Sequence, residues 1–266
     1  MSRGRFRAVS HAAACVLGVV VLSAAGCGST SGPRGAPVTN RARAASRPDT
    51  TGVADLPIVE VAVASPGSLM AVLLTGDGGW AASDKAMAAA LAAHGVPVVG
   101  VDSRAYLMHG RTPDQLGEDL RRILRHYVAA WHRPQVIVAG YSRGAELAPF
   151  MVARLPDDLR RRVALVALLG PSKSTSFRFH WVDLVLSQPR GADVPVPPEI
   201  EKLRGIPTQC IYGTKDPDAI CAALDSTLAQ PIARNRGHRV MPDEADWVAT
   251  TLLGAIKSTP AQSPAQ

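Results

Sequence analysis

The chain has 266 residues, of which 47% are hydrophobic, 19% charged and 5% aromatic. This apolar content suffices for a core and excludes a wholly disordered protein, and because only the N-terminus holds a long apolar run, a multi-span membrane protein is also excluded. The net charge of +7 does not predict nucleic-acid binding, because residues 1–50 hold seven Arg and one Asp, whereas the remainder holds 22 basic against 21 acidic residues.

Residues 1–26 have the pattern of a lipoprotein signal peptide. Three arginines within the first seven residues precede a short apolar run over 12–25, a length typical of a secretory signal rather than a membrane-spanning helix. The run ends in Ala-Ala-Gly before Cys27, which resembles the site where bacterial lipoproteins are cut and lipidated. We therefore predict a lipid on Cys27 and a location in the periplasm or cell envelope, with Gly28 favouring the outer membrane.

Low-complexity segments flank the predicted folded domain. Residues 27–52 are rich in Gly, Ser, Thr, Pro, Ala and Arg, a composition that predicts a flexible tether. At ~5–6 Å times the square root of its length, this tether reaches roughly 25–30 Å from the lipid. Residues 257–266 are a similar Pro/Ser/Ala tail. A single folded domain is therefore expected over residues 53–256.

Six apolar runs within this domain predict β-strands. The middle runs are continuously apolar instead of alternating with polar residues, which is typical of parallel strands covered by helices on both faces. The predicted strands are Ile58–Ala64, Met70–Thr75, Val96–Asp102, Gln135–Gly140, Val163–Leu169 and Thr208–Tyr212.

Helical segments lie between and after these strands. Residues 111–131 show the clearest start, with Thr112 as N-cap, Pro113 in the first turn and Gln115 completing a capping box. The strand–helix alternation predicts an α/β domain with a mostly parallel sheet and helices on both faces. The predicted helices are Asp84–His94, Arg111–Trp131, Gly144–Leu155 and Asp246–Ile256.

A nucleophile-elbow pattern, G-x-S-x-G, spans Gly140 to Gly144 with Ser142 at its centre. It follows a predicted strand and opens a predicted helix, which is the context that this motif requires. The flanking glycines let strand and helix approach closely while the serine projects from the turn. The positive end of the helix dipole favours a developing oxyanion. We predict that Ser142 is the nucleophile of a serine hydrolase.

A serine nucleophile needs a histidine base and a carboxylate that orients the base. With a nucleophile elbow, the chain order is serine, then acid, then histidine. Asp216 follows the predicted strand 208–212, at the carboxyl end where sites collect. His238 lies in a loop before the last predicted helix. We predict that Ser142, Asp216 and His238 are the catalytic residues.

Other candidates for the acid and the base lie downstream of the elbow. Asp183 and Asp218 are the alternative acids, and Asp218 is only two residues beyond Asp216. The second downstream histidine, His180, lies in an apolar stretch and is expected to be structural.

The glycine-rich run Thr75–Trp80 is the predicted oxyanion loop. Backbone N–H groups must stabilise the tetrahedral oxyanion in acyl transfer. We assign one donor to the amide of Asp77, with Gly78 as the alternative, and the second to the amide of Arg143 beside the nucleophile. The run lacks the Lys-Ser/Thr of a phosphate loop and the G-x-G-x-x-G of a dinucleotide site, so nucleotide binding is not expected.

The four cysteines have separate predicted fates. Cys15 leaves with the signal peptide and Cys27 carries the lipid. Cys210 and Cys221 remain, and their positions flank Asp216 in an exported domain, so a disulfide is expected there. Two thiols without a nearby histidine do not suit zinc. We predict no metal and no organic cofactor.

Several segments together resemble the AcvB/VirJ family of bacterial virulence-associated exported proteins. They cover nearly all of the predicted domain and are far more specific as a set than the elbow alone. These segments are residues 76–80, 106–113, 140–150, 210–221 and 237–238.

The resemblance implies an α/β-hydrolase fold and hydrolysis of lysyl-phosphatidylglycerol at its aminoacyl ester. Its substrate is a membrane lipid that carries ammonium groups, which Glu146 or Asp77 is expected to bind. Gly78 and Trp80 are further expected substrate contacts. Glu146 has an alternative interpretation as a structural acid.

Two alternatives to this function are carried forward. One is another exported lipase, esterase or thioesterase. The other is a non-catalytic accessory lipoprotein of secretion or virulence that retains the fold. The sequence predicts no oligomeric state.

Overall fold

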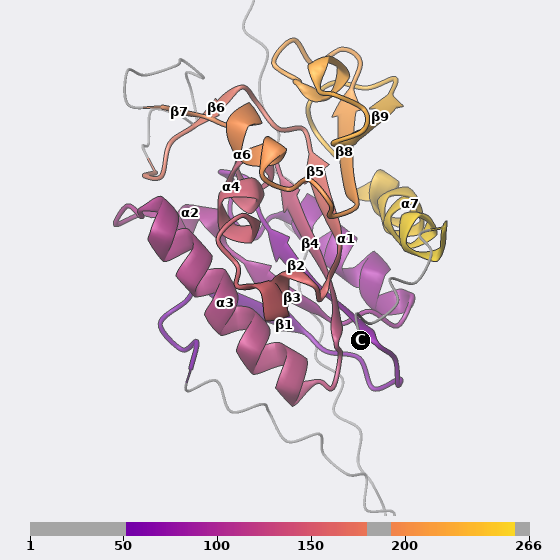
Figure 1. The fold of residues 1–266 in the computed structure, drawn as a ribbon. Helices are drawn as coiled ribbons and strands as arrows, with labels where there is room; N and C mark the ends of the chain where they lie inside the picture. Colours follow the sequence, from indigo (N-terminus) through magenta and orange to yellow (C-terminus); the bar gives the residue numbers. More distant parts are fainter. Residues whose placement is uncertain (1–51, 180–192, 259–266) are drawn as a thin grey trace, which may run out of the picture. The chain divides into compact units, whose positions relative to one another are not determined.

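The computed structural model describes residues 52–179 and 193–258 (Figure 1). The chain divides into two units, Met1–Ser46 and Arg47–Gln266, and every described residue belongs to the second. The predicted signal peptide, the lipidated Cys27, His180 and Asp183 lie outside the described residues. No helix in the described ranges is long and apolar enough to cross a membrane.

A seven-stranded sheet has the order β1-β3-β2-β4-β5-β8-β9. β1 is antiparallel to β3, and every other neighbouring pair is parallel, which confirms the mostly parallel sheet. Its strands are β1 (Ile58–Val61), β2 (Leu69–Leu74), β3 (Val98–Val101), β4 (Gln135–Tyr141), β5 (Val163–Leu169), β8 (Thr208–Gly213) and β9 (Gln230–Arg234).

Helices cover both faces of this sheet (Figure 1). Along β2, Leu74 lies in the core cluster that packs against α3 and α4, whereas Leu73 lies in the cluster that packs against α1 and α7. Successive side chains of a strand point to opposite faces, so a continuously apolar strand supplies both clusters. The helices are α1 (Ala82–Ala93), α3 (Pro113–Ala130), α4 (Arg143–Val152) and α7 (Ala245–Ser258).

Short elements complete the described domain at its loops. They are the helices α2 (Ser103–Leu107), α5 (Asp157–Arg160) and α6 (Pro197–Glu201), and the 3₁₀ turns η2 (Cys221–Ala223) and η3 (Pro242–Glu244). The strands β6 (Ser174–Thr175) and β7 (Val194–Pro195) form a separate two-stranded sheet.

The sequence signals at the start of α3 are confirmed. Thr112 Oγ1 accepts a hydrogen bond from Gln115 N at 3.2 Å, and Gln115 Oε1 accepts one from Thr112 N at 2.9 Å. Pro113 is the first helical residue, where its missing N–H costs nothing. The reciprocal cap fixes where α3 begins and therefore which residues face the sheet.

The predicted strands and helices differ from the structure mainly at their ends. β1 stops at Val61, β3 begins at Val98, and α7 continues two residues beyond Ile256. β9 was not predicted, because its sequence contains Pro231 and most of its side chains are exposed. An edge strand tolerates both features, since one side of its backbone has no strand partner.

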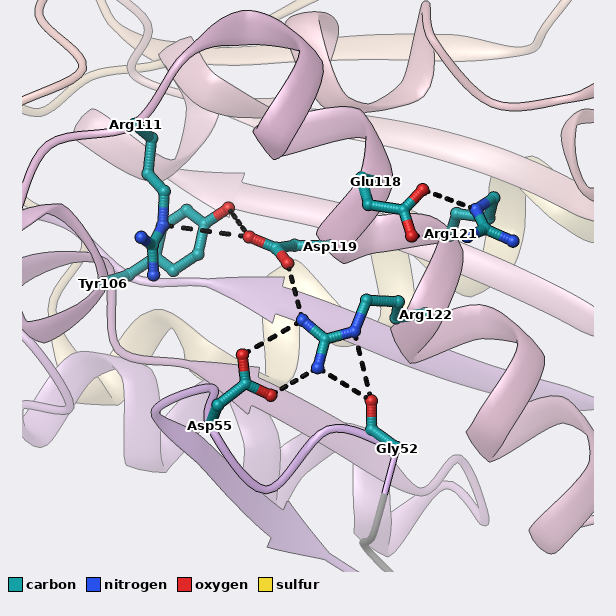
Figure 2. Close-up of polar contacts among 8 residues, drawn as sticks. All are labelled: Gly52, Asp55, Tyr106, Arg111, Glu118, Asp119, Arg121 and Arg122. Atoms are coloured by element: carbon teal, nitrogen blue, oxygen red, sulfur yellow. Dashed lines mark hydrogen bonds and ion pairs between the residues drawn. The ribbon is translucent and has the colours of Figure 1, made fainter.

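A polar cluster fastens the first described turn to α3 (Figure 2). Arg122 holds the carboxylate of Asp55 with two nitrogens, Nη2 and Nη1, the latter at 3.1 Å, and Nη2 donates to Gly52 O at 2.9 Å. Arg122 Nη1 also contacts Asp119 Oδ1 at 2.9 Å, and Asp119 Oδ2 accepts from Tyr106 Oη at 2.7 Å. None of these residues belongs to the predicted site.

Candidate active site

Ser142 lies on a strained turn between β4 and α4. Its φ of 51° and ψ of −117° place a non-glycine residue in a region that L-amino acids rarely adopt. A Cβ on Gly140 would lie 2.2 Å from Gly144 O, and one on Gly144 would lie 2.1 Å from Leu74 O. Both flanking positions therefore require glycine, and the turn is the predicted nucleophile elbow.

The three predicted catalytic side chains meet at the carboxyl ends of β4, β8 and β9. His238 Nε2 lies 2.9 Å from Ser142 Oγ, and His238 Nδ1 lies 2.7 Å from Asp216 Oδ2. Asp216 is almost fully buried, with 3% of its side chain exposed, whereas the His238 side chain is 36% exposed. An unbroken run of hydrogen-bonded groups thus links a buried carboxylate to an accessible hydroxyl.

The loops after β8 and β9 are joined by their backbones. Thr214 N donates to Arg234 O at 2.8 Å, and Lys215 N donates to Arg236 O at 3.0 Å. A Cβ on Gly213 would lie 2.2 Å from Gly237 O, so glycine is needed for this close approach. These contacts hold the loop that contains Asp216 beside the loop that contains His238.

The structure distinguishes between Asp216 and its neighbour Asp218. Asp216 contacts the imidazole, while Asp218 is exposed and contributes its backbone amide, which donates to Asp216 Oδ1 at 3.1 Å. Both carboxylate oxygens of Asp216 are therefore engaged.

Arg234 contacts the backbone of the histidine loop, and no sequence motif indicated this residue. Its side chain is 5% exposed and pairs with Glu244 through Nη1 and Oε1 at 2.6 Å. Its Nη2 lies 3.3 Å from Gly237 O and 3.4 Å from Arg239 O, the carbonyls on either side of His238. A buried guanidinium thereby contacts the backbone on both sides of His238.

Tyr141 is a second residue that sequence reasoning missed. Its ring stacks against the His238 ring, with centroids 6.0 Å apart and an interplanar angle of 28°. Tyr141 Oη accepts a hydrogen bond from Val240 N at 3.4 Å, and burial raises the pKa of the phenol. The residue before Ser142 thus packs against one face of the His238 ring.

The predicted oxyanion loop passes beside the nucleophile. A Cβ on Gly76 would lie 3.3 Å from Ser142 Cβ, and Gly79 N donates to Gly76 O at 3.0 Å, closing a turn over Asp77 and Gly78. Within the described part of the chain, neither the Asp77 nor the Gly78 amide donates to another protein atom. These amides remain the candidate first donor.

The side chain of Arg143 forms the centre of a polar network beside the elbow. Its Nε and Nη2 donate to Asp77 Oδ1 and Oδ2 at 3.1 and 3.3 Å. Its Nη1 donates to Glu146 Oε2 and to Thr175 Oγ1, both at 3.1 Å. The arrangement joins the oxyanion loop, the first turn of α4 and β6.

Two of the expected substrate contacts are engaged inside the protein. The Glu146 side chain is 7% exposed and paired with Arg143, and burial raises the pKa of its carboxyl against the opposing effect of that guanidinium. Trp80 packs on β3, since a Cβ on Gly100 would lie 2.2 Å from its ring. These positions agree with the structural interpretation of Glu146. Gly78 is exposed.

The expected disulfide is present. Cys210 on β8 and Cys221 on η2 are bonded, with their Cα atoms 5.4 Å apart, and both residues are fully buried. The bond closes the segment that carries Asp216.

Removing this bond is expected to lower the free energy of unfolding by about 3 kcal/mol, because a closed loop of this length restricts the unfolded chain. The measurement is urea unfolding of Cys210→Ala/Cys221→Ala beside the wild type, each with and without reductant. Reductant should weaken the wild type and leave the variant unchanged. Equal responses would contradict a stabilising role for the bond.

Asp84 on α1 is a buried carboxyl group, 2% exposed. Its Oδ2 accepts from Ala81 N at 3.3 Å, whereas Oδ1 has no hydrogen-bond partner among the described residues. Burial raises the pKa of this carboxyl from 3.8 to about 6. The folded protein therefore binds this proton more tightly than the unfolded chain does.

The stability that Asp84 contributes is consequently lost as the pH rises from about 4 to about 6. We expect Asp84→Asn to remove this dependence, so that the unfolding free energy of the wild type falls relative to the variant by about 2 kcal/mol between pH 4 and 7. Denaturant unfolding at a series of pH values measures the difference. A difference that stays constant over this range would refute the assignment.

No cluster of three or more His, Cys, Asp or Glu side chains that could hold a metal ion occurs in residues 52–179 and 193–258.

A parallel sheet that leads into a serine turn, with an acid and a histidine on two later loops, is the arrangement of the α/β-hydrolase fold. Solved structures similar to this chain support the assignment of the fold. The chain is similar to the esterase Est1E from Butyrivibrio proteoclasticus, with a TM-score of 0.52 and 13% identity over 71% of this chain and 88% of that one. It is similar to an esterase from Pyrococcus furiosus, with a TM-score of 0.53 and 14% identity over 71% and 82%.

A protein from Thermus thermophilus matches with a TM-score of 0.51 and 17% identity over 80% of this chain and 99% of that one. At these identities the likeness establishes the fold alone. The chain belongs to the VirJ family of bacterial virulence proteins, whose family model matches residues 68–259. No curated protein matches the chain.

Proposed function

We propose that this VirJ-family protein is an exported serine hydrolase that cleaves the aminoacyl ester of lysyl-phosphatidylglycerol or a related aminoacylated phospholipid. The observation that carries the hydrolase proposal is the hydrogen-bonded run from Asp216 through His238 to Ser142 on a nucleophile elbow. Membership of the VirJ family supports the choice of substrate, because the family resemblance implies a lysyl lipid.

Ser142 Oγ attacks the ester carbonyl while His238 Nε2 takes its proton. The imidazolium donates through Nδ1–H to Asp216, whose carboxylate stabilises the charge. The backbone amides of Arg143 and of Asp77, or alternatively Gly78, bind the oxyanion. The Arg143 amide suits this role because it directly follows the proposed nucleophile at the start of α4, where the second oxyanion donor of a nucleophile elbow lies.

Collapse of the tetrahedral intermediate breaks the bond to the glycerol oxygen of the lipid, which leaves with the proton from His238. Lysine remains as an ester on Ser142. His238 then takes a proton from water, the hydroxide attacks the acyl carbon, and Ser142 leaves with that proton. The products are free lysine and phosphatidylglycerol, and no step uses a metal or organic cofactor.

A lipid on Cys27 in the cell envelope brings this chemistry to the surface that holds the substrate. The lipid anchor and the lipid substrate would then lie in the same membrane, and the tether would let the folded domain reach the substrate.

The test uses the full-length chain with phosphatidylglycerol vesicles that contain lysyl-phosphatidylglycerol. We expect stoichiometric release of lysine and phosphatidylglycerol, and labelling of Ser142 by a fluorophosphonate probe. Labelling with hydrolysis of simple acyl esters but no lysine release would favour another lipase or esterase. Neither labelling nor hydrolysis would favour the non-catalytic accessory protein and overturn the proposal.

A further inference from the structure

The two residues proposed to supply oxyanion amides are also joined to each other by their side chains. Asp77 lies in the loop after β2 and Arg143 is the first residue of α4, so they are distant in sequence. Arg143 Nε and Nη2 meet the two carboxylate oxygens of Asp77 at 3.1 and 3.3 Å. Such a bidentate pair restricts the relative orientation of the guanidinium and the carboxylate as well as the distance between them.

The Arg143 guanidinium is itself held from its other edge. Its Nη1 donates to Glu146 Oε2 and Thr175 Oγ1, and its side chain is 14% exposed. Glu146 lies on the same helix one turn later, whereas Thr175 belongs to β6. The guanidinium therefore presents a fixed edge to the oxyanion loop instead of moving as a surface arginine would.

The loop that contains Asp77 has little side-chain anchorage of its own. Gly76 and Gly78 flank Asp77 and carry no side chains, while the far end of the loop is held where Trp80 N donates to Asp102 Oδ2 at 3.3 Å. Among the side chains from Gly76 to Gly79, only that of Asp77 can therefore fix the loop against the elbow.

We propose that the Asp77–Arg143 side-chain pair sets the separation of the two oxyanion amides, so that both residues act as positioning residues through their side chains. The inference rests on the proposed hydrolase function. An oxyanion donor works only within about 2.7–3.1 Å of the developing charge, and losing one donor costs about 10²–10³ in kcat. A flexible glycine loop without the pair would spend little time at that distance.

This role differs from the expected binding of a substrate ammonium by Asp77. Both oxygens of its carboxylate accept hydrogen bonds from the Arg143 guanidinium, so the carboxylate of Asp77 is already engaged within the protein. Positioning changes the transition state and hence kcat, whereas ammonium binding in the ground state changes KM. The two roles are therefore separable by kinetics.

The molecule offers a matched control in the Asp55–Arg122 pair (Figure 2). It also joins a loop aspartate to a helical arginine through two nitrogens, here Nη1 and Nη2 where Arg143 uses Nε and Nη2, and neither residue supplies an oxyanion amide. Asp55→Asn therefore removes a bidentate ion pair, a more exposed one, without touching the proposed site.

The experiment compares full-length wild type, Asp77→Asn, Arg143→Lys, the double variant and Asp55→Asn. Steady-state hydrolysis of a soluble ester gives kcat and KM, and the fluorophosphonate labelling rate gives a second measure of oxyanion stabilisation. We expect Asp77→Asn to lower kcat and the labelling rate by about 10- to 100-fold with KM within about twofold. Asp55→Asn should keep wild-type kcat and lower the unfolding midpoint by about 2–4 °C.

The double variant should be no slower than the slower single variant, because either substitution breaks the same pair. The pH dependence of kcat should keep its midpoint in all of them, since His238 and Asp216 are untouched. Arg143→Lys keeps the positive charge but cannot form the bidentate contact with Asp77. If Asp77→Asn does not fold, the kcat and labelling rate of Arg143→Lys test the proposal instead.

The outcomes separate this inference from the function on which it rests. A wild type that neither hydrolyses esters nor reacts with the probe overturns the hydrolase proposal, and the positioning role with it. A reactive wild type with equal labelling rates and kcat in Asp77→Asn overturns only the positioning role. A raised KM at unchanged kcat would also overturn it, in favour of substrate binding by Asp77.

Discussion

Ser142→Ala is expected to reduce ester hydrolysis by at least about 10³-fold, because the nucleophile is lost while only oxyanion stabilisation and substrate binding remain. The change removes one oxygen whose hydrogen-bond partner is His238 Nε2 at 2.9 Å. The measurement is lysine release from lysyl-phosphatidylglycerol vesicles, together with probe labelling.

The fold should survive this substitution. Ser142 N donates to Leu169 O at 2.8 Å, and alanine keeps this backbone bond and the same φ constraint. The unfolding midpoint should therefore stay within about 2 °C of the wild type, since a small polar deletion at a half-buried position has a small effect. Hydrolysis at the wild-type rate by a folded Ser142→Ala protein would end the serine mechanism.

Asp216→Asn is expected to lower kcat by about 10³–10⁴-fold while leaving the structure folded. An asparagine that keeps its carbonyl toward the Asp218 amide would present an N–H group to His238 Nδ1. The imidazole would then have to accept at Nδ1 and carry its proton on Nε2, where it cannot take the proton of Ser142. Single-turnover kinetics with a chromogenic ester measures the acylation step directly.

Asp218→Asn is the matched control for the acid. Its carboxylate is exposed, and its contribution to the site is a backbone N–H that the substitution retains. Its kcat should remain within about twofold of the wild type, as for a surface substitution away from the reacting atoms. If Asp218→Asn were the slower of the two variants, the assignment of the acid would be wrong.

The α/β architecture was predictable because its strands are buried on both faces. A run such as Val163–Leu169 is apolar throughout, and the structure places β5 over that same range. Helix starts were predictable where a local signal exists, as at Thr112, since a cap is decided within four residues. The edge strand β9 had no such signal, because pairing with β8 alone holds it in the sheet.

The positions of the three catalytic candidates were predictable because they too are marked in the sequence itself. The fold dictates their order along the chain, and a glycine pattern marks the elbow. The residues that hold them were not predictable. Arg234 contacts the carbonyls beside His238 through the particular fold of its own loop, and the Tyr141 ring meets the His238 ring only when that loop lies against the elbow. The packing of Trp80 against Gly100 likewise depends on a contact between separate elements.

The grip of Arg234 on both carbonyls beside His238 bears on how the base moves. In the proposed reaction the imidazole passes a proton from the serine oxygen to the leaving-group oxygen, which occupy different corners of the tetrahedral carbon. Because the main chain is held on each side of His238, the imidazole can move only by rotation about its two side-chain torsions. Side-chain torsions relax far faster than loops rearrange, so the proposed proton transfer requires no slow rearrangement of the histidine loop.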